Sequence, residues 1–454
     1  MTSSAQASTG VDDRTAERLA AALRCATVSS DTGPASSDTA AEFDKLAAHL
    51  EQCFPLAHAE LEITRFGHSR LYRWAGTSPG TAAILLAHLD VVPVDDEQRW
   101  THPPFAGAVD DEFVWGRGAI DDKSRVLAIL EAVETALAEG RRPDRTIFLA
   151  FGHDEEALGR DGAARMAAHL RSLEVRADLL LDEGGVVTDG IAPGVRRPTA
   201  FLMLGEKGWA TVRLAVTDPG GHSSMPGRQT AVGRIARAVA RLQDRPMPLR
   251  LPPVTADMLT RLRPALPALP RAALGLLPRA SAAVTRLMAA QPQTEALVRT
   301  TTAPTVIRGG VKANVLPQSA EALVNFRILP GDSVAGVLEH CRRVVRDNGI
   351  DLELVGVSSE PSDITGPGPA FDVVAEITRA VVPEAIVTTG IVPGATDSRY
   401  YDGLAATRCN FAPIVLDAAD LKRIHGTDER LSRINYGRLI DFNRRLIDHY
   451  THQP

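Results

Sequence analysis

Cysteine is scarce in this sequence, and no two cysteines stand close together. The four are Cys25, Cys53, Cys341 and Cys409. This spacing excludes a Cys-x-x-Cys pair and argues against both a cysteine zinc site and a disulfide framework. We therefore expect reduced, buried thiols.

Long apolar runs and basic clusters are also missing. No stretch reaches the roughly 18 apolar residues of a transmembrane helix, and residues 1–13 lack the pattern of a signal peptide. The net charge of −6 comes from 50 basic and 56 acidic residues spread along the chain. We therefore expect a cytoplasmic protein with no membrane span and no nucleic-acid partner.

The chain has 454 residues, which is too long for one compact core and predicts two or three domains. Its 44% hydrophobic and 23% charged residues are ordinary globular values, so a packed interior is expected. The polar residues 1–12 are expected to be disordered.

Short apolar runs alternate with helical patterns in the first part of the chain. The runs lie at 82–86, 146–151 and 179–181, and helices are predicted over 123–139 and 162–172. This alternation indicates an α/β domain with a mostly parallel central sheet flanked by helices. The pattern occupies 13–206 and returns over 358–454, so the domain is discontinuous.

The intervening residues 207–357 show a different order. Strands and helices follow one another as β-α-β-β-α-β, which is the ferredoxin-like pattern. A segment rich in Pro, Leu, Ala and Arg, at about 245–300, interrupts it. This insertion is either a helical segment packed on the surface or a flap over an apolar acyl pocket.

A histidine and an aspartate follow the first apolar run. His88 and Asp90 are two residues apart, so in an extended chain they point to the same side. An imidazole can bind zinc while a neighbouring carboxylate orients the ring. Taken alone, His88 also fits an ordinary polar residue at a strand end.

Adjacent acidic residues occur at three further places where an element ends or begins. Asp121 and Asp122 precede a helix; they could bridge two cations or simply stabilise the helix N-terminus. Glu155-Glu156 follows the second apolar run, Asp182-Glu183 ends the third, and His425 lies far downstream. Adjacent carboxylates repel each other unless a positive group such as a metal pair is present. Nitrogen and oxygen donors without thiolates suit a di-zinc site, which cobalt or manganese could also occupy.

In this order, the motifs resemble those of the di-zinc aminoacylase and carboxypeptidase family. They are His-x-Asp, Gly-Arg-Gly-x-x-Asp-Asp-Lys, Asp-Glu-Glu, Asp-Glu-Gly-Gly and a late His-Gly, and they cover almost the whole chain. The stretches 299–303, 310–315, 324–327 and 396–399 resemble the branch of Gly-Xaa carboxypeptidases and N-fatty-acyl amino acid synthase/hydrolases. The resemblance implies a zinc-peptidase-like catalytic domain, with 207–357 as a lid or dimerisation domain.

The resemblance also implies a ligand set for two zinc ions: His88 and Asp182 for one, Glu156 and His425 for the other, with Asp121 bridging both. The choice of Asp182 over the adjacent Glu183 rests on the family pattern, because their chemistry does not separate them.

The remaining roles are likewise implied by the resemblance. Asp90 would orient His88, Glu155 would be the general base, and His222 would stabilise the oxyanion, in dimeric relatives from the other subunit. Three residues would contact the substrate's carboxylate or carbonyl: Asn314, Arg327 and Arg399. Blander alternatives stay open, such as turn residues for His222 and Asn314 and a surface ion pair for Arg327.

The expected activity is hydrolysis of the amide bond of N-acyl amino acids that carry a free carboxylate, with apolar acyl chains favoured. Arginine suits such a carboxylate because its planar fork binds two oxygens. A Gly-Xaa dipeptidase is the alternative within the enzyme class, and an inactive metal-binding scaffold is a remote one. A homodimer through the inserted domain is a further expectation.

Overall fold

The computed structural model describes residues 10–30, 36–192, 194–277 and 279–452. Residues 1–9, part of the segment expected to be disordered, lie outside this range. For residues 10–12 the expectation is wrong. The Asp12 side chain accepts a hydrogen bond from the Thr15 backbone at 2.7 Å and caps the first helix, and the Val11 amide donates to the Arg433 carbonyl.

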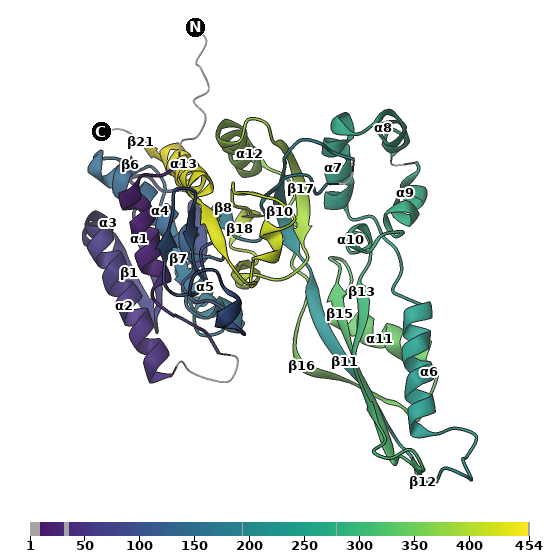
Figure 1. Ribbon diagram of the computed structural model, residues 1–454. Coiled ribbons are helices and arrows are strands. Elements are labelled where there is room, and N and C mark those ends of the chain that lie inside the picture. The colour runs from purple at the N-terminus through teal and green to yellow at the C-terminus, as the bar shows by residue number, and fades with distance from the viewer. Residues whose placement is uncertain (1–9, 31–35, 193, 278, 453–454) are drawn as a thin grey trace.

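A ten-stranded, mixed sheet forms the centre of the larger domain (Figure 1). Its inner strands β7, β3, β8 and β18 are parallel to one another, whereas β10 runs antiparallel to β18. In order, the strands are β1 (Glu62–Phe66), β2 (Ser69–Trp74), β7 (Ile147–Gly152), β3 (Ala82–His88), β8 (Ala177–Asp182), β18 (Ala405–Asn410), β10 (Thr199–Glu206), β9 (Val187–Thr188) and β19 (Val415–Leu416), with β17 (Ile386–Val392) beside β10.

Helices cover both faces of this sheet. All seven residues of β3 are buried, and they alternate between two apolar clusters. Leu85 packs into the cluster with α1 (Asp13–Leu23), α2 (Ser37–Cys53), α3 (Pro55–Glu60), α4 (Lys123–Ala138), α12 (Pro369–Val381) and α13 (Arg433–Tyr450). Ile84 and Leu86 pack against α5 (Ala163–Ser172) on the other face. The predicted α/β domain, with a mostly parallel central sheet flanked by helices, is therefore confirmed.

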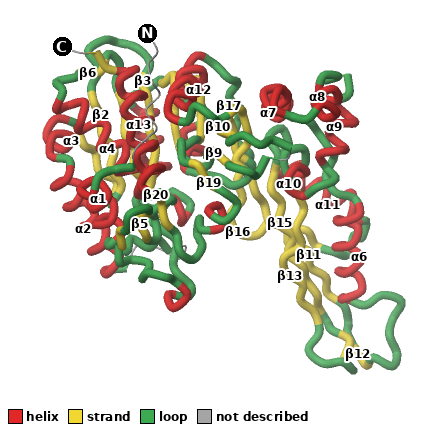
Figure 2. The backbone as a smooth tube through the Cα atoms, turned by 45° about the horizontal axis from the view of Figure 1, so that its top comes forward, coloured by secondary structure: helices red, strands yellow, loops and turns green. Residues whose placement is uncertain are grey.

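The second sheet has the order β13-β15-β11-β16 and is antiparallel throughout. This is the ferredoxin-like arrangement, as predicted. One residue in two along β11 and β15 is buried, and these side chains pack under α6 and α11. The elements are β11 (Gly208–Thr217), α6 (Ala231–Asp244), β13 (Thr301–Gly309), β15 (Ser319–Ile328), α11 (Val334–Val345) and β16 (Asp351–Ser359). We call this domain the lid; it extends away from the larger domain (Figures 1 and 2).

The insertion is helical and packs on the larger domain. It contains α7 (Pro253–Leu262), α8 (Ala268–Leu274), α9 (Ser281–Met288) and α10 (Pro292–Glu295). The β17 hydroxyls anchor α7, since Thr389 donates to Asp257 at 2.9 Å and Thr388 donates to the Met258 carbonyl at 3.2 Å. Of the two interpretations of this segment, these contacts favour the surface-packed one.

Membrane-spanning helices are absent from the described part of the chain. None of the helices within residues 10–452 that the structure describes combines the length and apolar character needed to cross a bilayer.

We expect the lid core to depend on Phe326, which is completely buried in β15. Phe326→Ala removes the whole buried phenyl ring and should lower the free energy of unfolding by about 3–5 kcal/mol. Chemical denaturation measures the change. Ile307→Ala in β13 is the matched control: because Ile307 is 61% exposed, the expected change is within about 0.5 kcal/mol. Equal effects of the two substitutions would contradict this account of the lid core.

Candidate metal centre

The acidic and histidine motifs meet at the carboxyl ends of the parallel strands. β3 ends at His88, directly opposite Gly152 at the end of β7, and β8 ends at Asp182. Glu155 follows β7 in the short helix η2 (Glu155–Ala157). The carboxyl ends of neighbouring parallel strands lie at the same edge of the sheet, and α/β proteins bind ligands at this edge.

The carboxylate of Asp121 lies between two imidazoles. Its Oδ1 is 2.9 Å from Nε2 of His88, and its Oδ2 is 3.1 Å from Nε2 of His425. Nε2 of His425 is also 2.9 Å from Oε1 of Glu156. Each oxygen of Asp121 thus faces a different histidine, which is the arrangement expected of a carboxylate that bridges two cations.

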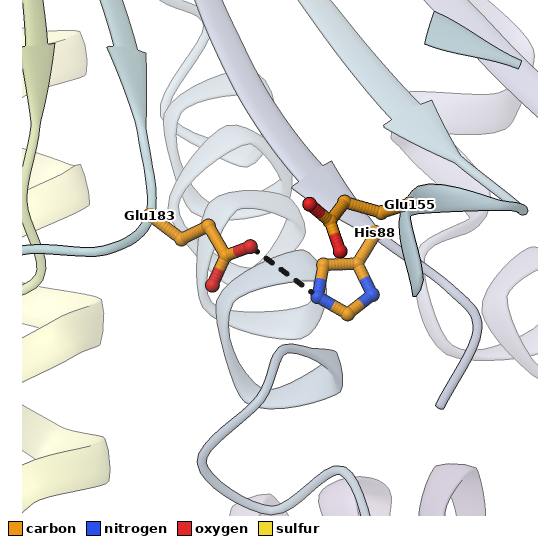
Figure 3. A group of neighbouring side chains, drawn as sticks. All are labelled: His88, Glu155 and Glu183. Carbon is orange, nitrogen blue, oxygen red and sulfur yellow. Dashed lines mark ion pairs between the residues drawn. The ribbon is translucent and has the colours of Figure 1, made fainter. Parts of the chain in front are cut away.

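Two further carboxylates flank His88, as Figure 3 shows. One belongs to Glu183, whose Oε1 is 3.6 Å from Nε2 of His88. The other belongs to Glu155, and donor atoms of His88, Glu155 and Glu183 all lie within 4.8 Å of one another. A second group with the same spacing comprises His88, Asp121 and Glu156.

Asp182, by contrast, turns its carboxylate into the protein. Its Oδ2 accepts hydrogen bonds from the Thr396 hydroxyl at 2.7 Å and the Ser398 backbone at 2.9 Å, and its Oδ1 accepts one from the Glu183 backbone. The buried carboxylate of Asp182 therefore already accepts three hydrogen bonds from within the protein. The structure therefore brings Glu183, and not the predicted Asp182, next to His88.

Asp90 supports this cluster in two ways. Its backbone carbonyl accepts a hydrogen bond from Nδ1 of His88 at 3.0 Å, which leaves Nε2 of the ring free to bind a cation. Its carboxylate accepts from the backbone N–H groups of Glu155 and Glu156 at 3.2 and 3.1 Å. Asp90 thus positions both the ring and the turn that carries the two glutamates.

The charges in this cluster do not balance. Burial, reinforced by the nearby Asp121, raises the pKa of Glu183 well above its usual range, and burial likewise raises the pKa of Glu155. Hydrogen bonds to Asp121 and Glu156 raise the pKa of His425 to about 10. The cluster thus brings together four carboxylates, of Asp121, Glu155, Glu156 and Glu183, and two imidazoles, so negative charge is in excess. Divalent cations bound by these nitrogen and oxygen donors would correct that imbalance.

Comparison with known proteins identifies the family. The model of the peptidase family M20/M25/M40 matches residues 84–449. This chain belongs to that family. It is therefore a hydrolase of the metallopeptidase type.

Several M20 relatives are similar along most of the chain. A probable carboxypeptidase S-like 2 of Dictyostelium discoideum is 37% identical, and the match covers 96% of this chain and 85% of the relative. The human N-fatty-acyl-amino acid synthase/hydrolase PM20D1 is 35% identical over 95% of this chain and 86% of the relative. Carboxypeptidase S of Saccharomyces cerevisiae is 31% identical, and the match covers 91% of this chain and 80% of the relative.

Solved structures of M20 proteins share the fold. The M20 metallo-carboxypeptidase Sso-CP2 of Sulfolobus solfataricus aligns with a TM-score of 0.70 at 18% identity, covering 97% of this chain and 99% of that one. Protein YXEP of Bacillus subtilis, described as a dinuclear metal-binding peptidase, aligns with a TM-score of 0.57 at 15% identity, covering 97% and 100%.

The lid residues expected at the site lie elsewhere in this chain. His222 is exposed in β12 (Gly221–His222), which pairs with β14 (Val315–Leu316), and the Ser223 amide donates to the Asn314 carbonyl. Both views place β12 at the end of the lid that points away from the catalytic domain (Figures 1 and 2). His222 and Asn314 are therefore close to each other but remote from the metal centre of the same chain.

The two predicted arginines lie where the lid joins the catalytic domain. Arg399 donates hydrogen bonds to the carbonyls of Thr396 and Leu158 at 2.9 and 2.8 Å. The central carbon of its guanidinium lies over the Trp209 ring, 5.5 Å from the ring centroid. Arg327 stands opposite Trp209 in the β11–β15 pairing and is exposed. Arg399 is thus already bonded to the backbone, whereas Arg327 has no hydrogen-bond partner among the described residues.

Two supporting acids escaped the sequence interpretation. Glu429 accepts hydrogen bonds from the Ile120 and Asp121 amides at 2.8 and 3.1 Å and pairs with Arg117 at 2.6 Å. Glu206, at the end of β10, accepts from the Ser398 hydroxyl at 2.8 Å. Glu429 lies four residues after His425, so its proximity in sequence was an available signal. For Glu206 no local signal exists.

The geometry predicts different outcomes for the two adjacent acids of the Asp182-Glu183 motif. Glu183→Gln should lower the metal content after dialysis from two ions per chain towards one, because a neutral amide is a weaker ligand than a carboxylate. Asp182→Asn should leave the metal content near that of the wild type. Elemental analysis of dialysed protein makes this measurement. Metal loss in Asp182→Asn but not in Glu183→Gln would restore the assignment made from the sequence.

Proposed function

We propose that this chain is a di-zinc hydrolase that cleaves the amide bond of N-acyl amino acids. One observation carries the proposal: the two oxygens of Asp121 face the Nε2 atoms of His88 and His425 separately. A carboxylate in that position fits two metal ions bound side by side. Membership of the metallopeptidase family supports hydrolysis of an amide bond as the class of reaction.

The proposed ligand set differs from the sequence prediction at one position. His88 and Glu183 would hold one ion, Glu156 and His425 would hold the other, and Asp121 would bind both. The donors are imidazole nitrogens and carboxylate oxygens, which suit zinc and would also accept cobalt or manganese. When bound, two such ions lower the pKa of a water molecule and polarise the amide carbonyl.

Glu155 is the proposed general base. Its carboxylate would take a proton from the attacking water and return it to the amine nitrogen that leaves when the C–N bond breaks. The backbone hydrogen bond from Glu155 to Asp90 fixes the position of this side chain relative to His88. Glu155 is half-buried beside His88, so the proton can be passed within the site.

The substrate's free carboxylate would bind at the junction of lid and catalytic domain. The exposed guanidinium of Arg327 is available for a paired hydrogen bond with two carboxylate oxygens. Arg399 is proposed in a supporting role, since it bonds the carbonyl of Leu158 next to the turn that carries Glu155. The resemblance to N-fatty-acyl-amino acid synthase/hydrolases favours an apolar acyl chain.

A Gly-Xaa dipeptidase is the second candidate, because relatives named carboxypeptidase S are also similar along the chain. Both candidates would use the same metal centre and the same general base. They differ in the group on the far side of the amide: an acyl chain in one and a residue with a charged amino group in the other. The cytoplasmic location expected from the sequence stays a prediction.

Hydrolysis of a substrate panel tests this proposal. Purified enzyme should release free amino acid from N-acyl amino acids faster than from Gly-Xaa dipeptides, and a chelator should abolish the release. Glu155→Gln should lower kcat by roughly 10²–10⁴-fold, the usual contribution of a general base, while both metal ions remain bound. Faster cleavage of dipeptides would favour the second candidate. Metal-loaded protein that cleaves no amide would support the inactive scaffold.

We also propose that His222 completes the site of a partner subunit. The histidine and Asn314 lie at the end of the lid together with the exposed apolar side chains of Met225 and Val311, which are 81% and 98% exposed. A second copy of the chain would cover this apolar surface and receive the imidazole near its metal centre. There the imidazole would donate a hydrogen bond to the oxyanion.

Mixing two inactive variants tests this arrangement. His222→Ala and Glu155→Gln should each be inactive alone. Their heterodimer keeps one site with both an intact Glu155 and an intact His222, so random exchange of subunits should restore about a quarter of the wild-type activity. Activity assays before and after subunit exchange make the measurement. No recovery, with heterodimers demonstrated by mass, would mean that His222 serves no site across the interface.

A further inference from the structure

The middle of the insertion, between Asp257 and Glu295, carries charge of one sign only. Between Asp257 and Glu295 the sequence holds five arginines and no acidic residue. Four of the five arginines are exposed: Arg263, Arg271, Arg279 and Arg286. The surface of α8 and α9 is therefore positive, although the whole chain has a net charge of −6.

The same two helices expose large apolar side chains. Leu269 in α8 is 85% exposed, Leu276 in the following turn is 63% exposed, and Leu287 in α9 is 73% exposed. Several exposed leucines in one small segment indicate an interaction surface, because soluble monomers rarely cluster large apolar side chains in contact with water. We call the four exposed arginines and three exposed leucines the Arg–Leu surface.

A basic cavity of about 770 Å³ adjoins this surface. Its walls include Leu266, Pro267 and Ile386, and none of the described residues that line it is acidic. Five arginines line it: Arg196, Arg197, Arg261, Arg271 and Arg379. Among the described residues, Arg196 and Arg379 have no hydrogen-bond or ion-pair partner, so two guanidinium groups are available to an anion.

The position of the cavity separates it from the metal centre. Ile386 begins β17, whereas the other end of that strand leads to Thr396, which bonds Asp182 beneath the metal centre. Seven strand residues span about 23 Å. Figures 1 and 2 show α8 and α9 at the periphery, on the opposite side from the lid end that carries β12. The Arg–Leu surface can therefore contact a large object without obstructing the proposed dimer contact.

We propose that the Arg–Leu surface docks on an anionic lipid bilayer. Leucines flanked by arginines match the interface of such a bilayer, where apolar side chains enter the acyl region and guanidinium groups meet phosphates. The arginine cavity would take the phosphate of one lipid headgroup. Docking is peripheral, since no described helix can span a bilayer. The proposal does not depend on which amide the enzyme cleaves.

Sedimentation with lipid vesicles tests the proposal on the full chain. The protein should bind vesicles of phosphatidylcholine that contain phosphatidylglycerol, should bind pure phosphatidylcholine vesicles much more weakly, and should be released by high salt. Arg279→Ala with Arg286→Ala should weaken binding roughly 25-fold, about fivefold for each arginine near the surface. Leu276→Gln with Leu287→Gln should weaken it by a similar or larger factor. None of these four side chains makes a hydrogen bond or ion pair with another described residue, so the fold should be retained.

Matched substitutions elsewhere serve as controls. Leu173 is 54% exposed and Arg99 is exposed, and both lie far from the insertion in the sequence. Leu173→Gln and Arg99→Ala should bind vesicles as the wild type does, and thermal unfolding should show that every variant is folded. The proposal is overturned by absence of binding to anionic vesicles at low salt, by equal binding to neutral vesicles, or by equal losses in the controls. Displacement by millimolar glycerol phosphate would instead identify a site for a small soluble anion and would also overturn it.

Discussion

Repulsion among carboxylates buried at one edge of the central sheet constrains this molecule more than any other interaction. Asp121, Glu156 and Glu183 converge on two imidazoles, and burial raises the pKa of Glu183 well above its usual range. Such a cluster is costly without compensating positive charge. The chain places it at the strand ends, where divalent cations can bind and where a substrate can reach them.

A second set of hydrogen bonds holds these ligands in place. The carboxylate of Asp90 accepts a hydrogen bond from the backbone N–H of Glu155, and the carboxylate of Glu429 accepts one from the backbone N–H of Asp121. The Thr396 hydroxyl donates a hydrogen bond to the Asp182 carboxylate, and its oxygen also lies 2.5 Å from Oε1 of Glu206. The strands β8 and β10 and the loop after β17 are therefore tied together beneath the metal centre. A site built on such a network keeps its geometry before metal and substrate arrive.

The two appended parts of the chain have different relations to the catalytic domain. The lid is a complete ferredoxin-like unit with its own core, and its far end carries His222 outside the reach of the chain's own metal centre. The insertion has only a small apolar cluster and rests on β17, leaving arginines and leucines exposed. Both parts expose apolar side chains that favour contact over exposure to water: the proposed partners are a second copy of the chain for the lid and a lipid bilayer for the insertion.

The sequence alone determined the fold class and most of the cluster. Apolar runs followed by His88, by the Glu155-Glu156 pair and by the Asp182-Glu183 pair are local signals, because parallel strands bring their ends together whatever the intervening helices contain. Only the tertiary structure separated Asp182 from Glu183. The two acids are adjacent and chemically alike, and the hydroxyl of Thr396, 214 residues away, decides which of them turns inward. The remote position of His222 was also undecided by sequence, since it depends on how the whole lid is oriented.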